Sequence, residues 1–393
     1  MRETAEIVVA GGGPVGLLAA HAFARTGAPA LILEARPSDA RPRESDLRQI
    51  VLAERARRLL VTLGLWSAVA PHAAPVRRVV VRAPRLGPPL VLDAAEHGLE
   101  ALGWTLGYDA LVRALRGAVA QNPRVSLRSG TRLLAAADGP SALELRLAGA
   151  EGEESLEAGL LIAAEGAGSD LAALGWPPEP AHEVRDTAWI APCRTEGIEP
   201  GTAVESFLDG GTATLLVTAA DRAVVTVLLP EARARREVTG DAAGRLARLA
   251  PAFGLAPGAL ETDGDGVDIR VRRGLRLRPF APRRLAIGSS FHALHPFAAQ
   301  GLLLAWRDAA LAARVLGARR ARGLPWTEES VLAEFVRSRR REHRQLDAFV
   351  HRLPPLLSAP GAFLGAPLWR LVALPPLRGL LGYWGMGYGW GRT

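Results

Sequence analysis

The chain has 393 residues, of which 49% are hydrophobic and 22% charged, and its formal net charge is +8. This composition predicts a globular protein with a substantial core, and the length suggests two or three domains. The single cysteine, Cys193, excludes an internal disulfide and a cysteine-based metal cluster, and we predict no metal site.

Charge and hydropathy restrict the partners. A basic chain suits nucleic acid or an anionic membrane surface, but no nucleic-acid-binding motif is present, so we predict no nucleic-acid partner. No uninterrupted apolar run reaches the ~20 residues of a transmembrane helix.

The segment 6–36 predicts a strand, a glycine-rich turn, a helix and a second strand. The run 7–9 is apolar and β-branched, typical of a strand buried on both faces. Gly11, Gly13 and Gly16 then form G-x-G-x-x-G. The first glycine permits the tight turn, the second lets the backbone approach a pyrophosphate, and the third lets the helix pack against the strand.

The helix expected over 14–25 directs its N-terminal N–H groups toward the phosphates, so Pro14 and Val15 join the glycines as candidate cofactor-binding residues. Glu34 ends the next strand, 18 positions after Gly16, where an acid binds ribose hydroxyls. A secretory signal is the alternative, but the glycines interrupt its apolar run. The segment therefore predicts dinucleotide binding.

Two later segments repeat the pattern of a buried strand that ends in small residues. The strand over 160–164 is followed by Glu165 and Gly166, and the strand over 285–288 ends at Gly288 before Ser289. A long loop, 289–301, then leads into a helix over 302–316, whose N-terminus is again an anion site. Taken alone, the first motif is better explained as an ordinary strand-to-loop exit.

The remaining pattern places further helices and strands. Residues 45–65 carry helical apolar spacing, and Arg48 near the helix start suits either a pyrophosphate or solvent. We also expect helices over 108–119, 231–249 (broken near Gly240) and 327–351 with Thr327 as N-cap, strands over 76–91, 125–127 and 143–147, and a hairpin over 212–229.

Two β-rich insertions, 73–103 and 181–270, are expected to form one sheet of a second domain. This gives a cofactor-binding domain over 1–72, 104–180 and 271–345, a substrate domain from the two insertions, and an apolar C-terminal helical tail over 346–393. The tail carries Trp369, Tyr383, Trp384, Tyr388 and Trp390. Such residues suit a membrane interface or packing on the domain, and both alternatives stay open.

With these motifs the chain resembles the group A flavoprotein monooxygenases, and within them most closely the ubiquinone-biosynthesis hydroxylases. The resemblance rests on Gly11–Gly16 with Glu34, on 164–169, on 286–301 with 306–308, and on 46–52, 205–216 and 375–387, so it covers nearly the whole chain. It implies an α/β fold like that of p-hydroxybenzoate hydroxylase, in which a Rossmann-like FAD-binding domain is interleaved with a β-sheet substrate domain.

The resemblance also implies the cofactors and site. FAD would be bound and NAD(P)H and O₂ used to hydroxylate an apolar aromatic ring, through a flavin C4a-hydroperoxide. The glycines and Arg48 would hold the pyrophosphate, Glu34 the ribose, Ser289 the ribityl chain, and the loop with His295, Pro296, Gln300, Gly301 and Leu302 would follow the flavin ring. No catalytic dyad is expected, because the cofactor supplies the chemistry.

Four positions depart from the family pattern: Glu165 stands for an aspartate, Ser289 for Asp or Asn, Ala299 for glycine, and Leu303 for asparagine. They keep open two alternatives to a prenylated-phenol hydroxylase: an enzyme acting on another aromatic or polyketide substrate, and an accessory subunit of a biosynthetic complex without turnover. We expect a cytoplasmic protein, with peripheral contact at the inner membrane and homo-oligomerisation as open alternatives.

Overall fold

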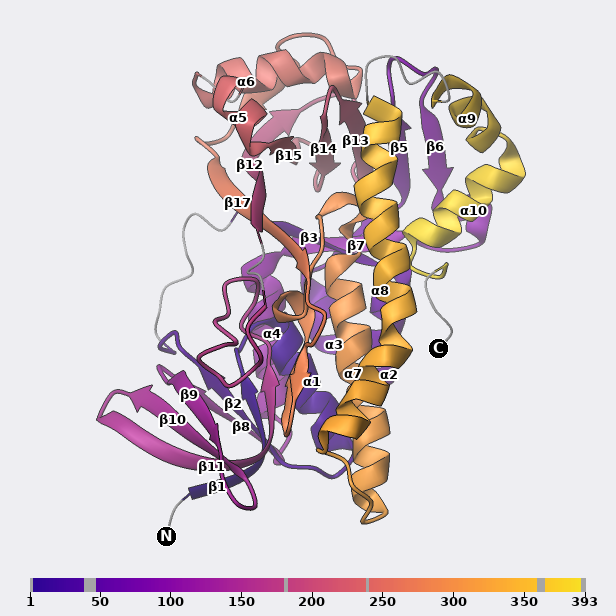
Figure 1. The fold of residues 1–393 in the computed structure, drawn as a ribbon. Helices are drawn as coiled ribbons and strands as arrows, with labels where there is room; N and C mark the ends of the chain where they lie inside the picture. The colour runs from indigo at the N-terminus through magenta and orange to yellow at the C-terminus, as the bar shows by residue number, and fades with distance from the viewer. Residues whose placement is uncertain (1–2, 39–46, 180–182, 238–239, 359–364, 390–393) are drawn as a thin grey trace.

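The computed structural model describes the chain except for residues 1–2, 39–46, 180–182, 238–239, 359–364 and 390–393. Two sheets form two lobes joined along one side by a long helix (Figure 1). The N-terminus lies in the lower lobe, and the last described residues return to the middle of the molecule.

The lower lobe is built on a central parallel sheet. Its strands lie in the order β19-β11-β1-β2-β8, all parallel to their neighbours: β1 (Glu3–Ala10), β2 (Ala30–Glu34), β8 (Val125–Ser129), β11 (Gly152–Ala163) and β19 (Arg284–Ala286). The antiparallel strands β9 (Arg132–Asp138), β10 (Leu143–Gly149) and β18 (Phe280–Ala281) extend it. The β-branched run 7–9 is fully buried at its centre, as a strand covered on both faces requires.

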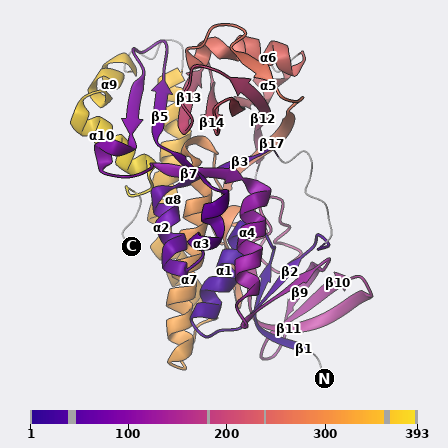
Figure 2. The same cartoon turned by 180° about the vertical axis from the view of Figure 1, so that it is seen from behind.

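Helices α1 (Pro14–Arg25), α4 (Tyr108–Ala120) and α7 (Gly301–Ala321) pack beside this sheet, with α2 (Glu54–Leu63) and α3 (Trp66–Val69) next to them (Figure 2). Leucines of α4 and of the β9–β10 hairpin join the same core: Leu111, Leu115, Leu143, Leu145 and Leu147. The predicted order of strand, helix and strand is confirmed, and the chain has the predicted α/β fold with interleaved segments.

The upper lobe is one mixed sheet. It joins β5 (Arg78–Arg82) and β6 (Leu90–Asp93) to β13 (Thr202–Leu208), β14 (Gly211–Val217), β15 (Arg222–Pro230), β12 (Glu183–Thr195), β16 (Leu260–Thr262), β17 (Val267–Leu275) and β20 (His292–Ala293). Strand β5 pairs in parallel with β13, so the two β-rich insertions share one sheet, as predicted. Helices α5 (Glu231–Glu237) and α6 (Ala242–Leu249) cover its outer face (Figure 1).

A small antiparallel sheet connects the lobes, made of β3 (Gln49–Ala53), β7 (Gly103–Gly107) and β4 (Ala74–Val76). The prediction of one helix over 45–65 is therefore wrong for its first half. Residues 49–53 pair with β7 across five positions, and this tertiary pairing overrides the helical apolar spacing. Of the predicted helix opening, Asp46 lies outside the described residues, and Arg48 precedes a strand.

Helix α8 (Glu329–Ser358) runs along both lobes, followed by α9 (Gly365–Val372) and α10 (Pro375–Gly385) beside β6 (Figure 1). It is continuous across residues 345 and 346, so the expected start of the tail falls inside a helix. Thr327 is not its N-cap: the Glu328 carbonyl accepts the bond from the Leu332 N–H, whereas the Thr327 carbonyl accepts from the Arg283 N–H. The 3₁₀ turns are at 70–72, 94–97, 250–253, 288–290 and 297–299.

Candidate functional site

A cleft of about 1280 Å³ opens at the carboxyl ends of β1, β2 and β11, the edge where open α/β sheets bind ligands. It exceeds the ~300–1,000 Å³ of a pocket for one drug-sized ligand. The three predicted motifs meet here. Of the predicted residues, the following line the cleft: Gly11, Gly13, Pro14, Val15, Glu34, Arg48, Glu165, Gly166, Gly288, Ser289, Pro296, Gly301 and Leu302.

The glycine turn shows which glycines the protein itself requires. Gly11 has φ +109°, and a Cβ there would lie 2.6 Å from the Ala164 carbonyl oxygen. A Cβ on Gly16 would lie 1.9 Å from the Gly11 carbonyl oxygen. These two glycines are therefore needed for the tight turn and for the packing of the helix, as predicted.

Gly13 is different. Its φ of −76° is open to any residue, and a Cβ there would meet only the Tyr108 hydroxyl, at an ordinary 3.5 Å. No neighbouring protein atom explains a glycine at this position. The space beside it faces the cleft at the N-terminus of α1, where a pyrophosphate would lie against the backbone. The turn therefore fits a bound dinucleotide.

The start of α1 is held from the third motif. The buried Trp306 indole on α7 donates to the Pro14 carbonyl at 3.0 Å. A Cβ on Gly288 would lie 3.1 Å from a methyl group of Val15, so the end of β19 packs directly on the first turn of α1. Trp306 was expected only as part of the 306–308 segment that carries the family resemblance, without a role of its own.

Glu34 lies at the end of β2 with its carboxylate fixed by two backbone donors. The Gly12 N–H donates to Oε2 at 2.8 Å and the Arg36 N–H to Oε1 at 2.9 Å. An ionised carboxylate has about four acceptor sites, so both oxygens can still accept from ribose hydroxyls.

Arg48 and Tyr108 form a pair in the wall of the cleft, with the Tyr108 hydroxyl beside the glycine turn. The Arg48 guanidinium lies 3.9 Å from the centre of the Tyr108 ring, and the Tyr108 N–H donates to the Arg48 carbonyl at 3.0 Å. The interaction holds the cation at the cleft wall. Arg36, Arg113, Arg116 and Arg132 also line the cleft, which suits an anionic ligand. The sequence pattern identified Tyr108 only as the first residue of a helix.

Ser290, rather than Ser289, joins the second and third motifs. Its buried hydroxyl donates to the Gly166 carbonyl at 3.1 Å and lies 3.2 Å from the Gly166 N–H. Ser289 is exposed and lines the cleft, where its hydroxyl can reach a ligand. The Glu165 carboxylate accepts from the Ser169 hydroxyl at 2.8 Å, within its own loop.

Only some of the predicted site residues in the loop before α7 line the cleft. Pro296, Gly301 and Leu302 line the cleft, but His295 and Gln300 do not. His295 Nδ1 accepts from the Phe297 N–H at 3.2 Å, and burial with nearby Arg273 lowers the pKa of His295 to about 3, so this imidazole is neutral and shapes the loop. The buried Gln300 donates to the Gly385 carbonyl at 2.8 Å and so anchors the end of α10.

The two remaining departures from the family pattern lie in or after this loop. Ala299 has φ +52°, a left-handed conformation that glycine adopts more readily, so its Cβ strains the turn. Leu303 is buried and contacts Gly387 of the C-terminal segment instead of lining the cleft. Helix α7 begins at Gly301 without a side-chain cap, which leaves its positive dipole end at the cleft.

The family model described as "FAD binding domain" matches residues 4–348. The chain belongs to this family. FAD is its cofactor, and it is an FAD-dependent aromatic-ring monooxygenase, the enzyme class predicted from the sequence.

Named relatives agree with this assignment at modest identity. The 3-demethoxyubiquinol 3-hydroxylase of Escherichia coli is 28% identical over 90% of this chain and 92% of its own length. The ubiquinone hydroxylase UbiL of Rhodospirillum rubrum is 26% identical over 91% and 82%. The crystal structure of p-nitrophenol 4-monooxygenase PnpA from Pseudomonas putida is 19% identical, covers all of both chains and has a TM-score of 0.77, which supports the fold.

Within the described part of the chain, no group of three His, Cys, Asp or Glu side chains could hold a metal ion. Cys193 is buried, and burial raises the pKa of its thiol to about 12, so it is an unreactive core residue. No described helix is long and apolar enough to cross a membrane.

Proposed function

We propose that this FAD-dependent enzyme hydroxylates a prenylated phenolic ring in ubiquinone-type quinone biosynthesis, with NAD(P)H and O₂ as co-substrates. The observation that carries the proposal is the cleft itself. It combines a glycine turn with room for a pyrophosphate, a fixed ribose acceptor and a helix N-terminus at its far end. The names of the two hydroxylase relatives support the quinone-precursor substrate.

Each residue then has a role toward the cofactor. Gly11 and Gly16 would hold the turn in shape, Gly13 would admit the pyrophosphate, Arg48 would offset its charge, and Glu34 would orient the ribose. When bound, FAD supplies the oxygen-transfer chemistry. The N–H groups of Gly301 and Leu302, at the start of α7, would stabilise negative charge on the ring, and Leu294 and Ala305 in the cleft lining would help exclude water.

An aromatic cluster beside the loop suits an apolar substrate. The Phe297 ring centre lies 5.6 Å from that of Phe207 on β13 and 6.0 Å from that of Phe349 on α8. The three phenylalanines therefore join the loop 289–301, the upper-lobe sheet and α8. We therefore assign the segments 73–103 and 181–270 to substrate binding.

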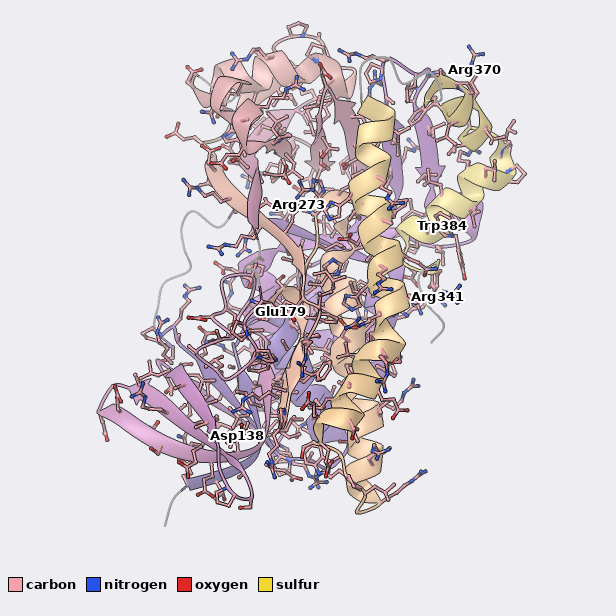
Figure 3. All side chains as sticks on the ribbon, in the orientation of Figure 1. Asp138, Glu179, Arg273, Arg341, Arg370 and Trp384 are labelled. Carbon is pink, nitrogen blue, oxygen red and sulfur yellow. The ribbon has the colours of Figure 1, made fainter. Side chains whose placement is uncertain are left out.

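The C-terminal helices expose an apolar surface, here called the α9–α10 surface, made of Leu368, Leu371, Leu374, Leu380 and Tyr383. Trp369 does not contribute, because it is buried and donates to the Pro88 carbonyl at 2.9 Å. The Trp384 ring packs near Phe349, and Trp390 lies outside the described residues. Arg370 projects from α9 near this surface (Figure 3). We propose that the surface rests on an anionic membrane from which the enzyme collects its lipid substrate.

Two experiments test these proposals. A prenylated phenol should stimulate NAD(P)H oxidation and be recovered with one added oxygen. Stimulation by soluble phenols or polyketides alone would favour the other hydroxylase alternative, and no oxidation with any aromatic would favour the accessory-subunit alternative. For membrane contact, the chain should sediment with phosphatidylglycerol vesicles at low salt, and Leu371→Ser/Leu374→Ser should abolish sedimentation; no sedimentation of the unaltered chain would refute the contact.

A further inference from the structure

Four side chains behind the cleft form one hydrogen-bonded chain that the cofactor motifs do not explain. His292 of β20 contacts His343 of α8 through their Nδ1 atoms at 3.0 Å. His343 Nε2 lies 2.9 Å from Asp308 Oδ2 on α7, and His292 Nε2 lies 3.1 Å from Asp347 Oδ1 on α8. Both imidazoles and Asp308 are about 1–2% exposed, whereas Asp347 is 39% exposed.

A neighbouring arginine fixes the direction of the bonds at Asp347. Arg273 of β17 can only donate, and its Nη1 lies 2.8 Å from His351 Nδ1, so that nitrogen accepts. His351 Nε2 therefore carries the proton and donates to Asp347 Oδ1 at 3.0 Å. Burial opposes ionisation of Asp347, but hydrogen bonds from His292 and His351 outweigh it and lower the pKa of this carboxyl. Figure 3 shows Arg273 where β17 passes α8.

Asp308 at the other end of the chain is also ionised. Burial raises the pKa of its carboxyl, but His343 and the Arg339 guanidinium, 2.6 Å from Oδ1, lower it by more. The two histidines are thus held between two carboxylates, and each carboxylate accepts a hydrogen bond from a protonated imidazole Nε2.

Counting hydrogens then determines the charge of the pair. The bonds to Asp308 and Asp347 each need a proton on Nε2 of one imidazole, and the central contact needs one on either Nδ1. Three protons on two imidazoles make one of them neutral and the other an imidazolium. Burial lowers the pKa of His292, so burial disfavours a charge on this imidazole. The His343 ring centre lies 4.3 Å from that of Phe291.

Other charged groups surround the pair. On α8, Glu342 pairs with Arg339 and with Arg307 of α7, and Arg55 of α2 acts on Glu342 from the far side. On the sheet side, Arg273 pairs with Asp186 of β12 at 2.9 Å. These ion pairs hold the side chains at both ends of the hydrogen-bonded chain in place. The proton between the two Nδ1 atoms is therefore the one that can move.

His292 is also among the residues that line the cleft, as are Pro296, Gly301 and Leu302. The central proton can shift between the two Nδ1 atoms: the N–H bond of His343 breaks as that of His292 forms, with no net gain or loss of protons. That shift brings a positive charge to the cleft wall, beside the positive end of α7.

We propose that His292 and His343 share one proton between ionised Asp308 and Asp347, and that this positive charge stabilises the negative charge the cofactor gains on reduction. The second half rests on the proposed function. The pair acts on the cofactor through its charge and is a positioning element rather than a catalytic acid.

The first test needs no cofactor. Nitrogen-15 NMR of the histidine rings in the full-length apo chain should show one cationic and one neutral imidazole in this pair at about pH 7.5, titrating together. Asp347→Asn should make the pair lose its charge at a lower pH. The exposed His72 is the matched control, and its signals should be the same in both proteins. Two neutral imidazoles at about pH 7.5 in the unaltered chain would overturn the shared proton, even if FAD binds normally.

The second test measures the midpoint potential of the FAD-loaded protein. This potential reports the ratio of its affinities for reduced and oxidised FAD. His343→Gln should lower this ratio about tenfold, which is about 30 mV for a two-electron couple, while His72→Gln leaves it unchanged. A shared proton seen by NMR with an unchanged potential in His343→Gln would overturn the role toward the cofactor. Failure of the chain to bind FAD would refute that role and the proposed function together, but the NMR result on the pair would stand.

Discussion

The contrast between two glycines of one turn gives a sharp test of the cofactor site. In Gly13→Ala the new methyl group meets only the Tyr108 hydroxyl at 3.5 Å, and the φ of −76° is unstrained. Alanine is a poorer N-cap than glycine by up to about 1 kcal/mol, and the loss of glycine freedom in the unfolded chain offsets about 0.4–1 kcal/mol of this. The free energy of unfolding should therefore change by less than about 1 kcal/mol.

The same methyl group should nevertheless occupy the space of the pyrophosphate. Loss of one charge-assisted hydrogen bond to a phosphate costs about 1.5–3 kcal/mol, so FAD should bind about 10- to 100-fold more weakly to Gly13→Ala. Titration of the apoprotein with FAD, followed by flavin fluorescence, measures this change.

Gly16→Ala is the matched control. Its methyl group would lie 1.9 Å from the Gly11 carbonyl oxygen, so the backbone must move. Overpacking of this kind costs about 1–3 kcal/mol or more, and the apoprotein should melt several degrees lower. The reasoning is refuted if Gly13→Ala binds FAD like the unaltered chain, or if both variants destabilise the apoprotein equally.

Three further variants follow from the structure. Ala299→Gly should raise the free energy of unfolding by about 1 kcal/mol, because φ +52° strains alanine, and unchanged urea denaturation would contradict this. Trp306→Phe should remove the bond to the Pro14 carbonyl, cost about 1–3 kcal/mol and weaken FAD binding; melting and FAD titration measure both effects, and normal values would show that the bond is dispensable. Burial raises the pKa of Glu205 to about 7, opposed by a hydrogen bond from Thr214, so its ionisation destabilises the fold as the pH rises from the ordinary value near 4.3 through about 7. Glu205→Gln should therefore gain stability relative to the unaltered chain over that range, by about 3–4 kcal/mol, and parallel pH profiles of the two proteins would contradict the shift.

Local pattern was sufficient for the strand, turn, helix and strand at the start of the cofactor-binding domain. The run 7–9, the three glycines and Glu34 each carry a short-range signal, and strand, turn and helix follow from them without knowledge of the rest. The hairpin of β14 and β15 was likewise visible from alternation around a polar turn.

Features that depend on contacts between residues distant in the sequence could not be predicted from local pattern. Strand β3 follows helical spacing in sequence, and only its pairing with β7 makes it a strand. The side chain of Gln300 sits inside a cofactor motif, yet it binds Gly385, which lies 85 positions away. The hydrogen bonds of Ser290, of Trp306 and of the His292–His343 pair join elements from separate parts of the chain, so no local pattern predicts these partners.

The most direct measurement is the visible absorption spectrum of the purified protein, followed by anaerobic addition of NADPH or NADH. The account predicts a bound-flavin spectrum at one FAD per chain that is bleached by one of the nucleotides. A colourless protein that does not take up added FAD would contradict the assignment of the cleft, and a bound flavin that neither nucleotide reduces would contradict the proposed monooxygenase reaction.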